Sequence, residues 1–237
     1  MFMQLIVNLD SDGFEMPYDH SYQLYSSIIK LVSSKDKNKA DKLHTYNSGL
    51  KFNMSQIMPG GKRHFTKTGF SGERFIFMIS SLDANLIIYF HDLFVASKEI
   101  ILFEHVFRIH SAISKNVNPS SEIITLITRS PAILKENKKY LSNESENEIL
   151  MAIKANILNK YLKVTGSMPD INFIKIVKLK RKIVEIKGTK LPAFMLGIAI
   201  SSNLEVLKFL LDVGLGSKNQ LGFGFLEEER MGDNFGV

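Results

Sequence analysis

The hydrophobic pattern of this 237-residue chain follows one order of strand and helix segments twice, and that order restricts the fold. Runs rich in β-branched and aromatic residues predict strands, and apolar residues three or four apart predict helices. In the first half the predicted strands are residues 2–9, 50–58, 73–80 and 99–113, and the predicted helices are 24–32, after Pro17, and 81–96, with Ser81 as the cap. Residues 33–42 are expected to form a charged connection, and 59–69 a turn followed by a basic loop.

The same order recurs after a polar, proline-bearing segment at residues 116–121. The predicted strands there are 122–128, 173–186, 194–201 and 222–226, and the predicted helices are 147–162 and 204–211. Strand, helix, strand, strand, helix, strand is the split βαβ order of a ferredoxin-like domain. We therefore predict an α+β protein of two tandem ferredoxin-like (RRM-like, βαββαβ) domains, residues 1–115 and residues 121–231.

Composition limits the class of protein. Hydrophobic residues make up 45% of the chain, enough for a packed core and against disorder. Cysteine is absent, which excludes disulfides and thiolate metal sites. The first ten residues lack the basic segment of a signal peptide, and no apolar run approaches the ~20 residues of a membrane span. We expect a cytoplasmic protein without a membrane, metal or cofactor site, and the net charge of +6 favours a polyanionic partner.

A glycine-rich segment near the C-terminus is the densest motif of the chain, with Gly-hydrophobic-Gly at 214–216 and again at 222–224. Glycine permits positive φ and close backbone approach, so such a loop can present bare N–H groups to a phosphate. The alternative is a tight turn with a glycine bulge. The predicted RNA-binding residues of this loop are Gly214, Gly216, Ser217, Lys218, Asn219, Gln220, Gly222 and Gly224.

A basic run lies between residues 175 and 190, where Glu185 is the sole acid. Its seven basic residues are Lys175, Lys178, Lys180, Arg181, Lys182, Lys187 and Lys190. In a strand Lys178, Lys180 and Lys182 share one face. We interpret the run as a ribbon that follows phosphates, with Lys178, Lys180, Arg181 and Lys182 as contacts, against the alternative of a solvated hairpin.

The spacing of the glycine pairs resembles the C-terminal loop of the RAMP superfamily, and most closely that of the CRISPR repeat-processing endoribonucleases. Three further segments are similar to that family in the expected order. They are the first strand–helix connection at 16–20, Leu43-His44 ahead of Phe52, and the Ser130-Pro131 element. Together with the glycine-rich loop they span nearly the whole chain.

The resemblance implies a metal-independent endoribonuclease that binds CRISPR repeat RNA. In that family the RNA 2′-hydroxyl attacks the phosphate and leaves a 5′-hydroxyl and a 2′,3′-cyclic phosphate. His44 stands at the catalytic histidine position, and imidazole exchanges protons near neutral pH. A catalytic tyrosine would fall near Ile29, which cannot act, so Tyr25 or Tyr46 is expected to substitute. Lys51 is an approximate match to a catalytic lysine.

Two other functions stay open at this stage. One is a CRISPR repeat-RNA-binding protein or effector subunit without catalysis, because the expected tyrosine is missing. The other is a tandem ferredoxin-like ligand-binding or assembly protein unrelated to RNA, which the glycine motif and the basic run disfavour. The sequence also leaves open a homodimer and contacts with other CRISPR effector subunits.

Overall fold

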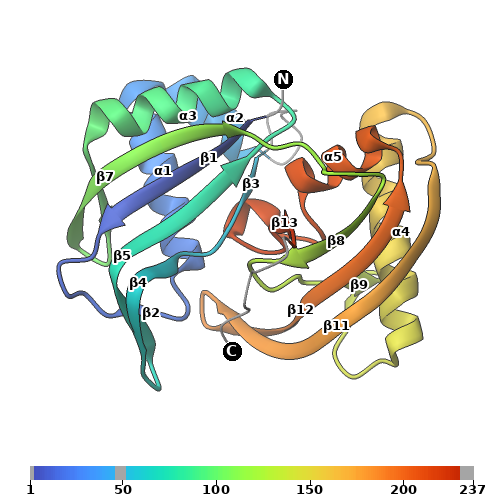
Figure 1. Cartoon of the computed structure of the whole chain (residues 1–237). Coiled ribbons are helices and arrows are strands. Elements are labelled where there is room, and N and C mark those ends of the chain that lie inside the picture. Colours follow the sequence, from blue (N-terminus) through green and yellow to red (C-terminus); the bar gives the residue numbers. More distant parts are fainter. Residues whose placement is uncertain (1–2, 46–51, 230–237) are drawn as a thin grey trace.

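The computed structural model describes residues 3–45 and 52–229, which form two antiparallel sheets side by side (Figure 1). In the N-terminal half the order β2-β5-β1-β7-β6 surrounds the central strands β1 (Met3–Asp10), β5 (Gly69–Ser80) and β7 (His105–Asn116). The strands β3 (Asn53–Met54) and β4 (Met58–Phe65) pair with β5, β2 is Met16–Pro17, and β6 is Glu99–Leu102. The helices are α1 (Ser21–Lys35), α2 (Lys37–His44) and α3 (Ala84–Ser97).

The C-terminal half has the sheet order β11-β12-β8-β13. Its strands are β8 (Ile123–Thr128), β11 (Ile171–Ile186), β12 (Thr189–Ser202) and β13 (Leu226–Glu228). The helices α4 (Glu146–Thr165) and α5 (Leu204–Val213) cover it, and β9 (Lys135–Glu136) and β10 (Lys139–Tyr140) form a small separate ribbon. In both halves the strands lie in the order second, third, first, fourth, so the prediction of two ferredoxin-like units is confirmed.

Each half buries a hydrophobic cluster of its own. The N-terminal cluster includes Leu5 and Phe77 of the sheet and Phe90 of α3, and the C-terminal cluster includes Ile198 of β12 and Ile153 of α4. The proposed division into residues 1–115 and 121–231 falls between β7 and β8 and stays a prediction. No helix in residues 3–45 or 52–229 is long and apolar enough to span a bilayer.

Two segments of the N-terminal half form regular structure that the sequence pattern did not predict. Residues 59–69 belong mostly to a long β4–β5 hairpin. Gly61, at φ 71°, lies in a bulge where the register shifts between Gly60 and Arg63, and it does not turn the chain. Residues 33–42 are helical except at Asp36, whose carboxylate accepts a hydrogen bond from the Lys39 amide (2.9 Å) and begins α2.

Three other boundaries also differ from the prediction. The strand expected at 99–113 is two strands, since Phe103 and Glu104 both adopt positive φ (50° and 62°) and turn the chain without glycine. Asp83, and not Ser81, caps α3. The strand expected at 222–226 is a loop, and β13 begins only at Leu226.

Candidate functional site

The predicted catalytic residues Tyr25 and His44 lie together at the ends of two packed helices. The Tyr25 hydroxyl is 3.2 Å from His44 Nδ1, and the two rings stack with centroids 6.2 Å apart. Tyr25 is buried on α1 and also stacks on Phe52, whereas His44 is the exposed last residue of α2. The helix break at Asp36 turns α2 back along α1 and thus brings residues 19 positions apart into contact.

The environment of the pair sets its hydrogen bond. Burial, with a smaller contribution from Tyr22, raises the pKa of Tyr25 above its ordinary value, so its hydroxyl keeps its proton at neutral pH. The protonated phenol can donate to Nδ1 or accept from it, according to the tautomer of the imidazole, and either bond fixes the orientation of the ring. His44 is therefore an exposed imidazole held in one orientation. The other two predicted partners, Tyr46 and Lys51, lie outside the described residues.

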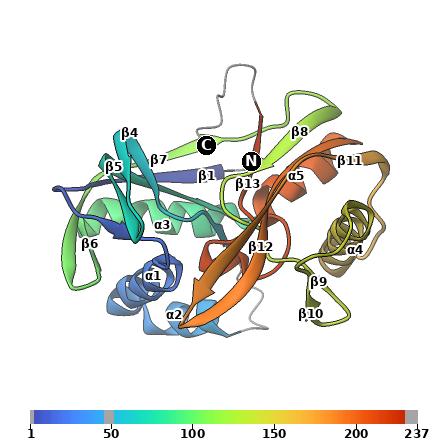
Figure 2. The same cartoon turned by 90° about the horizontal axis from the view of Figure 1, so that it is seen from below.

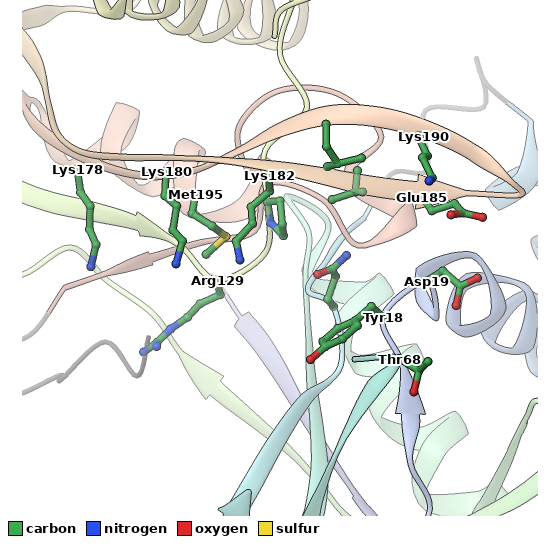
Figure 3. Close-up of a pocket in the computed structure, with 14 residues that line it drawn as sticks. Tyr18, Asp19, Thr68, Arg129, Lys178, Lys180, Lys182, Glu185, Lys190 and Met195 are labelled. Atoms are coloured by element: carbon green, nitrogen blue, oxygen red, sulfur yellow. The ribbon is translucent and has the colours of Figure 1, made fainter. Parts of the chain in front are cut away.

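A cleft of about 740 Å³ lies between the two halves (Figure 3). Part of the basic run lines one of its walls. Lys178, Lys180 and Lys182 project into it from β11, as their alternate spacing predicted. Tyr18 and Thr68 line the opposite wall. Arg129, in the Ser-Pro element, also lines the cleft and forms an ion pair with Glu227 of β13.

Arg181 lies on the other face of β11. Its Nη2 donates to the Glu144 carbonyl (2.8 Å) and its Nε donates to the Ser142 carbonyl (3.3 Å). These bonds fasten the loop before α4. Arg181, which we predicted as an RNA contact together with the three lysines, is therefore separated from them by the strand.

The glycine-rich loop does not offer its amides to a ligand, so the predicted N–H cradle is wrong for most of it. The amides bond inside the protein, at 2.8–3.2 Å. The pairs are Gly214 to Leu210 O, Leu215 to Gly224 O, Gly216 to Asn156 Oδ1, Ser217 to Ile133 O, Gly222 to Asn219 O and Gly224 to Pro131 O. The donors are consumed because the loop packs against the 130–133 segment and α4.

The glycines are required by close packing. A Cβ on Gly224 would lie 1.8 Å from the Leu215 carbonyl oxygen, and one on Gly216 would lie 2.6 Å from the Ile133 carbonyl oxygen. Both residues also have positive φ (68° and 75°). The alternative of a glycine-supported tight turn describes this loop better than the phosphate cradle does.

Asn219 and Lys160 fasten the loop from inside. The Asn219 side chain donates to the carbonyls of Leu215 (3.0 Å) and Phe223 (2.8 Å). Lys160 Nζ, on α4, donates to Asn219 Oδ1 (2.8 Å) and to the Gly214 carbonyl (2.8 Å). Asn219 is thus structural, which leaves Ser217, Lys218 and Gln220, all half-buried, as the loop's candidates for RNA contact. Sequence reasoning missed Lys160, since nothing in its spacing marks it.

The same loop joins the two halves of the protein. Its short helix η1 (Asn219–Leu221) packs on β3 and α1. A Cβ on Gly222 would come within 3.3 Å of the Ser55 carbonyl oxygen. Just before the loop, the Ser80 hydroxyl of β5 donates to the Asp212 carbonyl (3.0 Å). The loop therefore positions the N-terminal half, which carries Tyr25 and His44, against the C-terminal half, which carries the lysines.

His20, at the start of α1, is buried and structural. Its Nδ1 donates to the Pro17 carbonyl (2.6 Å) and its Nε2 accepts from the Ile57 amide (3.0 Å), a pattern that requires the neutral ring. Burial lowers the pKa of His20 to about 4. Among the residues that the structure describes, no three His, Asp or Glu side chains form a group that could hold a metal ion.

The depressed pKa of His20 predicts acid-sensitive stability. The unfolded chain takes up this proton near pH 6.5 and the folded chain only near pH 4, so stability is full above pH 6.5 and falls toward pH 4. The loss attributable to His20 is about 3 kcal/mol. Urea unfolding at pH 7 and pH 4.5 should show a smaller pH dependence for His20→Gln than for the parent protein. Equal dependence in both proteins would contradict this account.

Comparison with known proteins agrees with this architecture. Residues 114–228 match the family model for the C-terminal part of the CRISPR associated protein Cas6. The CRISPR-associated endoribonuclease Cas6 of Pyrococcus furiosus is 27% identical, over 96% of this chain and 89% of that protein. The CRISPR-associated endoribonuclease Cas6 1 of Methanocaldococcus jannaschii is 24% identical, over 94% and 92%.

Solved structures extend the likeness to the whole fold. A CRISPR associated protein Cas6 superposes with a TM-score of 0.81 at 23% identity, over 97% of this chain and all of that one. A structure described as a RAMP protein binding different RNA substrates also gives a TM-score of 0.81, at 21% identity, over 96% of this chain and all of that one. Residues 114–228 therefore match the Cas6 C-terminal family, and the chain as a whole is similar to Cas6 endoribonucleases in sequence and to Cas6 structures in fold.

Proposed function

We propose that the protein is a metal-independent endoribonuclease that binds CRISPR repeat RNA and cuts precursor transcripts within the repeat. The observation that carries this proposal is the hydrogen-bonded Tyr25–His44 pair, exposed on its histidine side, at the position where the family resemblance expects the catalytic histidine. Two relatives aligned over nearly the whole chain are named endoribonucleases, which supports the same activity.

The chemistry needs proton transfer at two oxygens. The 2′-hydroxyl loses its proton as its oxygen bonds to phosphorus, and the 5′-oxygen gains a proton as its bond to phosphorus breaks. The products are a 2′,3′-cyclic phosphate and a 5′-hydroxyl. His44 exchanges one of these protons through Nε2, and Tyr25 holds the ring by its bond to Nδ1. An oriented imidazole within reach of the reacting oxygens is the group that such a step requires.

The cleft supplies the RNA-binding surface in this proposal. Three lysines on one face of β11 track successive phosphates, and neutralising phosphates makes affinity fall with salt. Ser217, Lys218 and Gln220 of the glycine-rich loop extend the contact surface. One structural neighbour is described as binding different RNA substrates. That agrees with a surface whose lysines contact the RNA phosphates and not the bases.

The test uses the intact protein with a repeat RNA in EDTA and the same RNA with a 2′-deoxy nucleotide at the cut site. We expect cleavage of the first, no cleavage of the second, and binding that weakens with salt. Cleavage of the 2′-deoxy substrate would contradict the mechanism. Binding of both RNAs without cleavage would instead indicate a repeat-binding protein or effector subunit, and no binding would indicate a ligand-binding or assembly protein.

Two further aspects of the proposal concern the protein's setting. We place it in the cytoplasm, where precursor transcripts are made. A homodimer and contacts with other CRISPR effector subunits stay predictions. Light scattering of the purified protein, alone and with repeat RNA, distinguishes a monomer from a dimer.

A further inference from the structure

The β11–β12 hairpin ends in a two-residue turn that fixes the position of Lys187. Ile186 pairs with Thr189, and the two residues between them, Lys187 and Gly188, both have positive φ (51° and 76°). This is the twisted two-residue turn that closes hairpins tightly. Figure 2 shows the hairpin reaching from the C-terminal sheet to α1 of the N-terminal half. The hairpin thus brings the exposed Lys187 to the N-terminal half.

At the tip, Lys187 contacts α1, the helix that carries Tyr25. Its Nζ lies 4.0 Å from the centroid of the Tyr22 ring on α1. Tyr22 stands one helical turn before Tyr25, so the two side chains occupy the same face of α1. Tyr25 in turn contacts His44. Lys187, Tyr22, Tyr25 and His44 are therefore successive neighbours on the N-terminal half.

The glycine-rich loop holds the hairpin in this position. Ile186 and Leu191, which flank the turn, and Ala193 are buried against Ile133 and Phe223. Phe223 stands between Gly222 and Gly224, and Leu221 of η1 packs on the same cluster. The hairpin tip is therefore anchored on the loop that joins the halves, and it does not depend on Lys187 itself for its position.

We propose that Lys187 contacts the scissile phosphate beside Tyr25 and His44 and offsets the charge that develops there; this rests on the proposed endoribonuclease function. When O2′ bonds to phosphorus and the O5′ bond breaks, the non-bridging oxygens carry extra negative charge. A lysine ammonium placed against them stabilises that state more than the ground state, which raises the rate. Tyr22 holds the Lys187 ammonium through a cation–π contact.

The test compares single-turnover cleavage and RNA affinity in Lys187→Ala, Lys187→Arg and Lys182→Ala. Lys187→Ala is expected to lower the rate at saturating protein by roughly tenfold to a hundredfold, with affinity changed less than about threefold. Lys187→Arg keeps the charge and should recover most of the rate. Lys182→Ala removes the same charge from the cleft wall of the same hairpin and should weaken affinity with little change in the saturated rate. Lys163→Ala, on the exposed side of α4, serves as the unaltered control.

Each outcome decides a separate claim. A Lys187→Ala protein that cleaves at the parent rate would overturn the assignment, as would one that loses affinity at a nearly unchanged saturated rate, the result expected for Lys182→Ala. Failure of Lys187→Arg to recover the rate would also count against a role for the charge. If the parent protein binds the repeat RNA and never cleaves it, the proposed function fails first and this assignment with it.

Discussion

Replacing His44 with alanine is expected to lower cleavage at saturating protein by about 10²–10⁴-fold while leaving RNA affinity nearly unchanged. His44 is exposed at the end of α2, and the described contacts include one hydrogen bond between its ring and the Tyr25 hydroxyl. Removing the imidazole therefore takes away a proton-exchanging group without opening a cavity. Single-turnover cleavage and filter binding, measured on the same preparations, separate the rate from the affinity.

The matched control is His91→Ala, which removes a half-buried histidine from another helix of the same half. Tyr25→Phe should have a smaller effect, about tenfold, because the ring loses its orienting hydroxyl and stays packed on Phe52. Tyr46→Phe and Lys51→Ala test the two predicted partners that lie outside the described residues. A His44→Ala protein within a few-fold of the parent would show that the proton-transferring group lies elsewhere.

The order of secondary structure could be predicted because each half buries one face of a sheet under its helices. That arrangement leaves alternating and helical periods in the sequence. The predicted boundaries of strands were wrong where the residues typical of turns did not stand at the actual turns. Pro59-Gly60-Gly61 suggested a turn but forms a bulge inside β4, whereas Phe103-Glu104 turns the chain with no glycine, proline or asparagine.

The site was predictable in part. The lysines that share one face of β11 follow directly from strand geometry. The contact of Tyr25 with His44 does not follow from spacing, because it depends on how α2 folds back on α1. The glycine-rich loop was misjudged for a similar reason. Whether its amides point outward depends on Ile133, Pro131 and Asn156, which are distant in sequence, and no local pattern records those partners.

If the glycines of this loop serve packing, Gly224→Ala should destabilise the protein by about 3 kcal/mol or more. The added Cβ would stand 1.8 Å from the Leu215 carbonyl oxygen, a backbone atom that no side-chain rotation can move. The Leu215 amide also donates to the Gly224 carbonyl (2.8 Å). Moving the two residues apart to remove the clash would therefore break a hydrogen bond of the loop that joins the halves. Urea unfolding measures the loss of free energy.

Gly166→Ala is the control that isolates this steric effect. Gly166 ends α4 with φ 74°, close to the 68° of Gly224, but a Cβ there meets nothing within 4 Å. Its substitution should therefore lower the free energy of unfolding by about 1 kcal/mol, the backbone strain of an L-residue at positive φ. The difference between the two variants is the contribution of close packing at the loop. Should Gly224→Ala prove as mild as Gly166→Ala and weaken RNA binding instead, the loop would act at the ligand, and the interior role argued from its hydrogen bonds would be wrong.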